Sequence, residues 1–169
     1  MKQALDIDNI TIRTEIKPGD MGFITYLHGI LYDKEYSYSY DFERYVAVGL
    51  NEFLEHYDDA RDRLWIVEDH GQIVGSILIM GRSGDVAQLR YFILMPEYRG
   101  IGLGRKLMQL AMDFCKEAGY RSVYLWTTEE LHAAAYLYNH FGFKRTRQVP
   151  TSHFGKDVVE DCYDTQIKD

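Results

Sequence analysis

The chain has 169 residues, of which 46% are hydrophobic and 27% charged, and this composition is typical of one globular domain with its own core. The formal net charge of −7 argues against a nucleic-acid-binding surface. We therefore expect residues 1–169 to form a single domain whose partners are not nucleic acids.

Cysteine usage and the N-terminus indicate the compartment. The two cysteines have no metal-ligand spacing, so we expect no metal, and their low number fits a reducing compartment. Residues 1–13 lack a basic segment followed by an apolar one, so no signal peptide is expected. Apolar runs are too short to span a membrane. The sequence thus predicts a cytoplasmic protein that does not act on membranes.

Apolar periodicity and turn residues predict the elements in chain order. The first half reads as a strand at 10–14, a helix at 21–32, a polar loop at 33–40, a helix that Asp41 caps and that ends near His56, and strands at 64–67, 73–79 and 86–95. The second half reads as a helix from 102 to 118, a strand at 123–126, a short helix at 133–141 and an antiparallel pair at 143–149 and 159–167. This order predicts one α/β domain on a mixed sheet.

A glycine-rich turn joins the strand at 86–95 to the following helix. It reads Arg99-Gly100-Ile101-Gly102-Leu103-Gly104-Arg105-Lys106. Such a turn directs free backbone N–H groups and the positive end of a helix dipole at one point, which suits a phosphate group. Glycines let a ligand approach the backbone closely, and the three cations add charge at the rim.

Two common phosphate motifs do not fit this turn. A Walker A motif needs Ser or Thr after the lysine, and Leu107 stands there. A dinucleotide fingerprint needs GxGxxG in a first βαβ unit, whereas this GxGxG lies late in the chain, after a hairpin. The glycines alone also allow a purely structural turn.

The pattern Arg99-x-x-Gly102-x-Gly104, after a strand that runs into Met95-Pro96-Glu97-Tyr98, resembles the (Q/R)xxGx(G/A) signature of the GNAT superfamily of acyl-CoA-dependent N-acetyltransferases. Residues 134–143, AAYLYNHFGF, resemble the helix and turn that follow in that family. The resemblance extends from about Ile10 to Ile167. It implies a mixed, mostly antiparallel sheet with a V-shaped splay between two parallel strands, 86–95 and 123–128, flanked by about four helices. Residues 125–134 also resemble the acetyltransferase domains linked to MarR-type regulators.

The resemblance implies acetyl-CoA as cosubstrate and assigns its contacts. Backbone groups of Gly100 to Arg105 would hold the pyrophosphate, and the strand before them would contact the pantetheine and the thioester. The Leu94 N–H would polarise the thioester carbonyl. The implied cofactor-binding residues are Phe92, Ile93, Leu94, Arg99, Gly100, Ile101, Gly102, Leu103, Gly104 and Arg105.

Tyr138 matches the family tyrosine that protonates the leaving sulfur, so the resemblance implies that it is the catalytic acid. A packing role stays open, because Tyr138 shares a helix face with Ala134 and Phe141. The chain departs from the family at Leu131, where many members have a cofactor-binding Asn. The general base is not identified; the candidates near the expected cleft mouth are Glu129, Glu130 and His132.

The acceptor of such enzymes usually lies over the region between the first two helices. Residues 33–45 are rich there in carboxylates and tyrosines, which suit a cationic amine. We assign substrate binding to Tyr36, Tyr38 and Tyr40, with a solvated polar loop as an equal alternative. Residues 151–158, with His153 and Phe154, are expected to form the other wall. Polyamines, aminoglycosides, amino acids and protein amines all remain open.

The leading hypothesis is an N-acetyltransferase that transfers an acetyl group from acetyl-CoA to a primary amine of a small molecule or peptide by direct attack. The alternatives are a non-catalytic acyl-CoA-binding sensor on the same fold, a protein that binds another phosphate ligand at the turn, and an interaction module acting through the tyrosine-rich segment. Because family members are often dimers, the resemblance allows a homodimer, which no sequence feature demonstrates.

Overall fold

The computed structural model describes residues 7–168; residues 1–6 and 169, which the single-domain and signal-peptide predictions include, lie outside it. The described elements are β1 (Ile10–Arg13), α1 (Asp20–Tyr36), α2 (Tyr40–Glu55), β2 (Arg63–Asp69), β3 (Gln72–Gly81), β4 (Val86–Leu94), α3 (Leu103–Glu117), β5 (Ser122–Thr128), α4 (His132–His140), β6 (Lys144–Thr151) and β7 (Val158–Gln166). Their order confirms the order expected from the sequence.

The boundary between the first two helices differs from the prediction. The expected loop at 33–40 is wrong, because α1 continues to Tyr36 and only Ser37 to Ser39 link it to α2. Ser37 ends α1 in a left-handed conformation (φ 61°), with its N–H directed at the carbonyls of Asp33 and Tyr32. The cap of α2 is Ser39 rather than Asp41, since the Ser39 hydroxyl accepts the Asp41 N–H at 3.2 Å.

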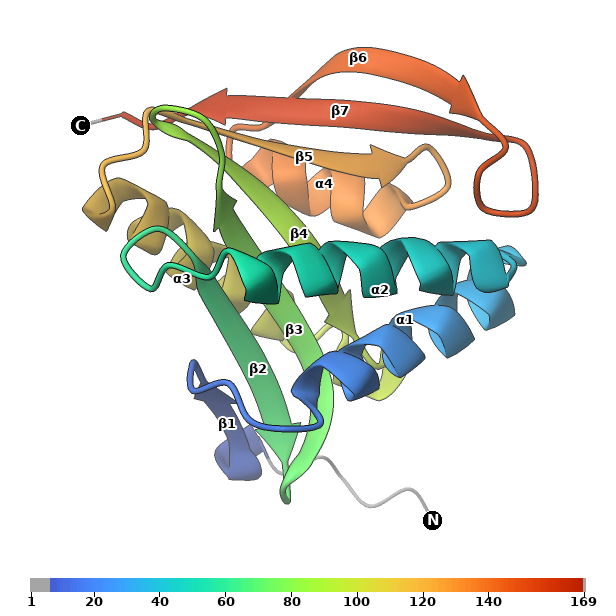
Figure 1. Cartoon of the computed structure of the whole chain (residues 1–169), viewed down its shortest axis with the longest axis horizontal. Coiled ribbons are helices and arrows are strands. Elements are labelled where there is room, and N and C mark those ends of the chain that lie inside the picture. The colour runs from blue at the N-terminus through green and yellow to red at the C-terminus, as the bar shows by residue number, and fades with distance from the viewer. Residues whose placement is uncertain (1–6, 169) are drawn as a thin grey trace.

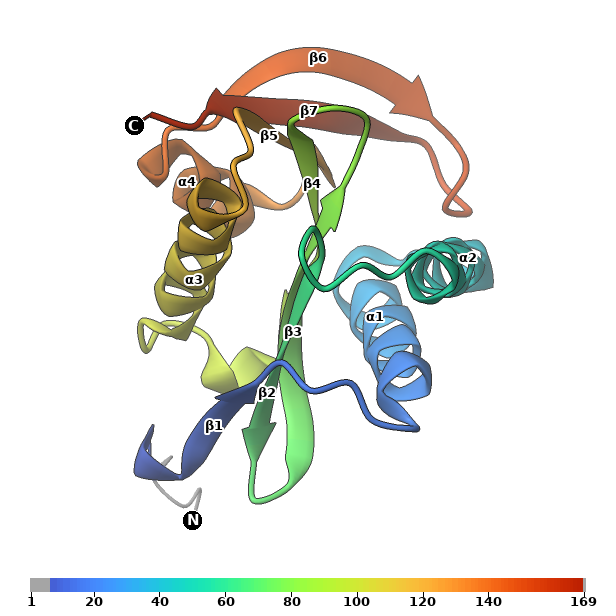
Figure 2. The same cartoon turned by 60° about the vertical axis from the view of Figure 1, so that its left-hand side comes forward.

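The strands form one sheet in the order β1-β2-β3-β4-β5-β7-β6, with α1 and α2 on one face and α3 and α4 on the other (Figures 1 and 2). Each face carries its own buried core. On the α3 side, Leu107, Ala111 and Phe114 pack against the sheet. On the α2 side, Val46 and Leu50 do so. The amphipathic helices thus each bury one stripe, as their spacing predicts.

Strands β4 and β5 make the parallel pair of the sheet, and their pairing is short. It covers Val86 to Gln88 against Ser122 to Tyr124, while every other neighbouring pair among the described strands is antiparallel. Beyond Gln88 the two strands are no longer hydrogen-bonded to each other. The V-shaped splay expected between them is confirmed.

A bulge in β4 marks the point where the splay opens. The register with β3 shifts between Ser76 and Leu78, opposite Tyr91, whose φ is 50°. The Ser76 hydroxyl donates to the Tyr91 carbonyl at 2.7 Å in the buried sheet and so holds this strained backbone. The bulge places both Arg90 and Tyr91 in the pocket described below.

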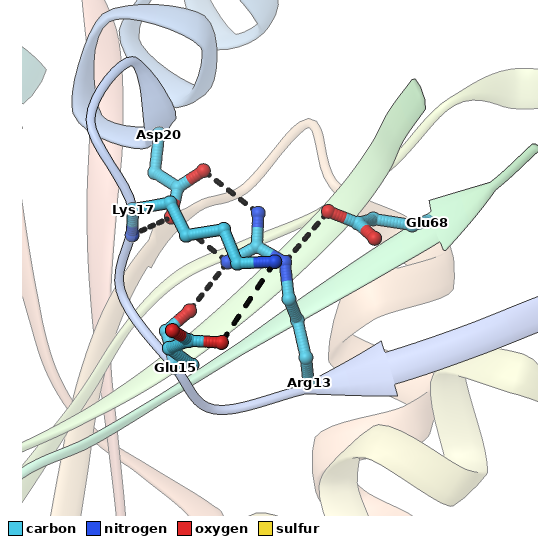
Figure 3. Close-up of polar contacts among 5 residues, drawn as sticks. All are labelled: Arg13, Glu15, Lys17, Asp20 and Glu68. Atoms are coloured by element: carbon cyan, nitrogen blue, oxygen red, sulfur yellow. Dashed lines mark hydrogen bonds and ion pairs between the residues drawn. The ribbon is translucent and has the colours of Figure 1, made fainter. Parts of the chain in front are cut away.

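The connection from β1 to α1 is fixed by an ion-pair network around Arg13 (Figure 3). The Arg13 guanidinium donates to both Asp20 carboxylate oxygens, at 2.8 and 2.9 Å, and to Glu68 on β2 at 2.6 Å. The Lys17 backbone N–H also donates to Asp20, at 2.6 Å. Since the Asp20 side chain is only 5% exposed, the network satisfies a carboxylate that water barely reaches.

We expect Arg13→Met to lower the free energy of unfolding by about 2 to 3 kcal/mol, because it leaves the buried Asp20 charge with only the Lys17 N–H. Urea denaturation measures the change. Arg121→Met is the matched control: Arg121 pairs with Asp85 at 3.1 Å, but its side chain is 85% exposed. The control should change stability by about 0.5 kcal/mol or less. Equal effects of the two substitutions would contradict the structural role of Arg13.

The ion pair between Arg13 and Asp20 also predicts that the stability of the protein depends on pH. Burial alone would raise the pKa of Asp20, but the hydrogen bonds from Arg13 and the Lys17 N–H outweigh it and hold this pKa below its usual value of 3.8. A carboxyl whose pKa is lowered on folding stabilises the protein above its unfolded-state pKa and loses that effect as the pH falls. The stability difference between wild type and Arg13→Met should therefore shrink below about pH 4.

Candidate functional site

The glycine turn sits where β4 ends and α3 begins. A short 3₁₀ turn, Pro96–Tyr98, follows β4, and Gly102 then occupies the position before the first residue of α3. Gly100 and Gly102 have φ angles of 76° and 87°, which residues with a Cβ rarely adopt. These two glycines are therefore required by the backbone itself, apart from any ligand.

The amides of this turn are free to bind an anion. The first hydrogen bond of α3 runs from the Lys106 N–H to the Gly102 carbonyl at 3.1 Å. The preceding N–H groups, from Gly100 to Arg105, donate to no acceptor within residues 7–168. Unpaired amides that converge at a helix N-terminus form a site suited to a phosphate or pyrophosphate group.

Arg99 is held beside this turn by two other segments. Its Nε donates to the Leu94 carbonyl at 2.9 Å, and its guanidinium forms a two-pronged ion pair with Glu35 of α1. The Glu35 hydrogen bonds raise the pKa of Arg99 further, against the effect of burial. Arg99 therefore carries a fixed positive charge at the rim, already shared with one carboxylate.

Phe92, Ile93 and Leu94 of β4 are expected to contact a pantetheine arm, but their backbone groups do not all face the splay. The Met95 N–H donates to Val74 of β3, and the Ile93 carbonyl also faces β3, next to Gly75. Because backbone polar groups alternate along a strand, the amides of Phe92 and Leu94 face the open side of the splay. The Ile93 side chain is buried against Leu27 and Leu31 of α1 instead. Phe92 and Leu94 are thus the two that can pair with a ligand in the splay.

Two adjoining cavities follow from this arrangement. The turn cavity is lined by Arg99, Gly100, Gly104, Phe92 and Leu94 among others. The inner cavity lies between α1, α2 and the splayed strands. Both cavities are lined by Tyr32, Phe92, Leu131 and Ala134, so they meet there.

Tyr138 of α4 lines the inner cavity. The residue is only 5% exposed, and its ring contacts those of Phe92, Phe143 and Tyr163. No hydrogen bond joins its hydroxyl to another residue in the described part of the chain. Burial, and to a lesser extent Tyr163, raise the pKa of Tyr138 above its usual 10, so the hydroxyl stays protonated at neutral pH. Its geometry is compatible with a proton donor and also with packing.

The tyrosines expected to bind substrate separate into three positions. Tyr38 is 1% exposed and lines the inner cavity, where its hydroxyl lies 2.9 Å from the Thr128 hydroxyl. Tyr36 lines the turn cavity. Tyr40 is 78% exposed and lines neither cavity. Only Tyr36 and Tyr38 are thus brought to the site; the substrate role of all three stays a prediction.

The loop from β6 to β7 closes the inner cavity, as expected. Phe154 lines it and stacks on Tyr38 at 5.4 Å between ring centroids, while His153 is exposed. The Ser39 N–H donates to the Phe154 carbonyl at 2.8 Å. Lys156 binds the Glu130 carboxylate at 2.6 Å and the Tyr36 carbonyl at 2.7 Å. The loop is therefore fastened to the helices on the opposite side of the cavity.

The expected base candidates do not line the inner cavity. Glu130 is engaged by Lys156, and Glu129 and His132 are exposed. Glu160 of β7, which the sequence reasoning missed, does line it. Burial raises the pKa of Glu160 above its usual value, and His153 opposes this. No ion pair or hydrogen bond within residues 7–168 engages its carboxylate.

His28, Tyr32 and Arg90 are further cavity residues that the sequence reasoning missed. His28 is buried, and burial lowers its pKa to about 4, so it is neutral at physiological pH. Its Nδ1 lies 2.8 Å from the Ile24 carbonyl, which makes Nδ1 the protonated nitrogen. His28 and Tyr32 are spaced i, i+4 on α1, a pattern that marks one helix face without showing what that face meets.

The chain combines a splayed α/β sheet, free amides at a helix N-terminus and an adjoining tyrosine-lined cavity. A protein with these features can hold an extended phosphate-bearing ligand alongside a second small molecule. The model of the acetyltransferase (GNAT) family matches residues 24–143. The chain belongs to this family.

Individual relatives agree with this assignment. The chain is 35% identical over 98 residues to the uncharacterized N-acetyltransferase YjgM of Escherichia coli, covering 56% of this chain but only 59% of that protein. Its fold is similar to that of yncA from Salmonella typhimurium, a structure with acetyl-CoA (TM-score 0.71, 19% identity, 95% of each chain). It is also similar to spermidine N-acetyltransferase from Vibrio cholerae in complex with CoA and spermine (TM-score 0.69, 23% identity, 95% and 96% of the chains).

Residues 7–168 offer neither a membrane-spanning helix nor a metal cluster. No helix there is long and apolar enough to cross a membrane. No group of three or more His, Cys, Asp or Glu side chains there could hold a metal ion. Both cysteines are free and buried, and burial raises the pKa of the Cys115 thiol to about 12, so this residue packs in the core.

Proposed function

We propose that the protein is an N-acetyltransferase that transfers the acetyl group of acetyl-CoA to a primary amine by direct attack. The observation that carries this proposal is the continuity of the site. The turn with free amides lines the turn cavity at Gly100 and Gly104, the open edge of β4 and Tyr138 line the cavities as well, and the two cavities meet. A phosphate-bearing carrier at the turn can therefore place its acyl end beside a protonated phenol.

In this proposal the pyrophosphate lies at the Gly100–Arg105 amides, and the pantetheine arm extends along β4 between β4 and β5. Phe92 and Leu94 offer backbone groups on that open edge, so the Leu94 N–H is the donor that polarises the thioester carbonyl. Family membership and the structural neighbours that hold acetyl-CoA or CoA support this choice of cosubstrate.

The chemistry needs one proton donor. The neutral amine attacks the thioester carbon, the C–N bond forms and the C–S bond breaks. The Tyr138 hydroxyl gives its proton to the departing sulfur, and the proton lost by the amine nitrogen restores the phenol. The burial that raises the pKa of Tyr138 also raises that of the thiol formed beside it, so a thiolate there takes a proton more readily than in water.

A panel of amines incubated with acetyl-CoA tests the proposal, with release of free thiol as the signal. We expect amine-dependent thiol release and an acetylated product detected by mass spectrometry. Acetyl-CoA binding without thiol release for any amine in the panel would favour the acyl-CoA sensor instead.

We further propose that residues 1–169 act as a single acetyltransferase domain. The match covers only 59% of the length of YjgM, so the activity of that relative is not carried over as a whole. The cytoplasmic location and the homodimer stay predictions from the sequence and from the family resemblance.

A further inference from the structure

The inner cavity contains two side chains of opposite charge, Arg90 of β4 and Glu160 of β7. All its other described lining residues are uncharged, including the neutral His28. A cavity with one cation and one anion suits a ligand that carries both charges. It is poorly suited to a polycation, which would meet the guanidinium.

The Arg90 guanidinium has aromatic neighbours but no anionic partner. It lies over the rings of Tyr91 and Tyr45, 4.8 and 5.5 Å from their centroids. No hydrogen bond or ion pair joins it to a residue in the described part of the chain. A half-buried guanidinium without a carboxylate is a typical binding site for a carboxylate ligand, since its fork matches two carboxylate oxygens.

Gly49 of α2 makes room for this arrangement. A Cβ at position 49 would lie 2.0 Å from the Tyr91 hydroxyl and 2.8 Å from an Arg90 nitrogen. The Tyr91 hydroxyl is buried without a hydrogen-bond partner among the described residues, and so is the Thr127 hydroxyl on β5. Both residues line the inner cavity with other atoms, since these two hydroxyl oxygens are themselves covered by protein.

Glu160 supplies the opposite charge. Its half-buried carboxylate makes no hydrogen bond or ion pair within residues 7–168, and the charge that acts on it is that of His153, which lowers its pKa against the effect of burial. Glu160 lies on β7, which pairs with β5 at Thr128. Aromatic rings of Tyr38, Phe42, Tyr45 and Phe154 form the wall between helix α2 and this strand. A carboxylate beside aromatic faces is a favourable environment for an ammonium group on an apolar molecule.

We propose that the acceptor is an amino acid with an apolar body, whose carboxylate binds Arg90 and whose ammonium group pairs with Glu160 before it is deprotonated. This inference rests on the proposed function, because it names the acceptor of that same site. Arg90 lies on β4 and Glu160 on β7, and strand β5 lies between these two strands in the sheet. The test therefore includes a long ω-amino acid, whose two charges are far apart, as well as an α-amino acid.

The test measures binding to the CoA-loaded protein by calorimetry, using two pairs of probes that differ only in the carboxylate. The pairs are L-phenylalanine with 2-phenylethylamine and 5-aminopentanoate with butylamine. For at least one pair, we expect the amino acid to bind about 10-fold tighter than the amine or more, since a site built for a carboxylate rejects the analogue that lacks it. Equal affinities in both pairs, or no binding of either amino acid, would overturn the proposal.

Variants assign the effect to the two charges. Arg90→Gln should bring the ratio between the affinities for the amino acid and for its matching amine close to one. Arg90→Lys should keep part of the preference for the amino acid. Glu160→Gln should weaken both members equally, because both carry the ammonium group. Arg44→Gln is the control: Arg44 is exposed on α2 beside Tyr45 and does not line the cavity, so the ratio should stay unchanged. A ratio that Arg90→Gln leaves intact would contradict the assignment.

Thiol release from acetyl-CoA, followed with the same probes, separates this inference from the proposed function. If amines are acetylated but amino acids are neither bound nor acetylated, the function stands and the inference fails. If an amino acid binds through Arg90 but no thiol is released with any probe, the amino-acid binding site stands, while the proposed function and the acceptor role that rests on it fail.

Discussion

Tyr138→Phe is expected to lower the turnover number about 100-fold or more while leaving the Kd of CoA within about twofold of wild type. The substitution removes one hydroxyl and keeps the ring, which is packed against Phe92, Phe143 and Tyr163. The hydroxyl has no partner among residues 7–168, so its loss breaks no internal hydrogen bond and the fold should be retained. Steady-state kinetics with an accepted amine and calorimetry with CoA give the two values.

Tyr136→Phe is the matched control for this experiment. Tyr136 lies on the same helix, two residues earlier, but it is 74% exposed and lines neither cavity. Its turnover number should equal that of wild type. An unchanged turnover number in Tyr138→Phe would show that Tyr138 only packs, and water would then be the proton donor.

Gly104→Glu is expected to weaken CoA binding by about 100-fold or more, because it places a carboxylate and its stem in the turn cavity where the pyrophosphate would lie. Gly104 is inside the first turn of α3 in a helical conformation, so the substitution should not disturb the backbone. Calorimetry with CoA measures the loss, and circular dichroism checks the helix content.

Gly104→Ala separates charge and bulk from the loss of glycine as such. A Cβ at position 104 would meet Phe92, Leu137 and Leu94 at 3.5 to 3.7 Å, which is ordinary contact. We expect this variant to bind CoA within about threefold of wild type, in keeping with the Gly-or-Ala position of the family signature. Equal binding by the Glu and Ala variants would place the pyrophosphate elsewhere.

Local features of the sequence predicted most of the fold. The turn between β4 and α3 could be recognised because glycine at 100 and 102 meets a backbone requirement, with φ angles of 76° and 87°. The period of α3 was clear because one apolar stripe of the helix packs against the sheet. The end of α1 was missed because Asp33 to Tyr36 are polar and exposed or half-exposed, and polarity alone does not separate a solvated helical turn from a loop.

The acceptor side of the site was less accessible to sequence reasoning. Arg90 and Glu160 lie 70 positions apart in the chain, and only the splay between β4 and β5 brings them to one cavity. Tyr38 and Tyr40 are two residues apart and chemically identical, yet one is buried and the other exposed, because Ser39, the N-cap of α2, lies between them and the helix begins at Tyr40. Such facts depend on how distant strands and helices converge, which no local pattern contains.

A titration of ¹⁵N-labelled protein with CoA, followed by amide chemical shifts, tests the central claim that free backbone amides at the start of α3 bind the pyrophosphate of the acyl carrier. We predict that the largest shifts occur at the amides from Gly100 to Arg105, with smaller ones at Phe92 and Leu94 along β4. Binding of CoA that leaves the Gly100–Arg105 amides unshifted would contradict the account.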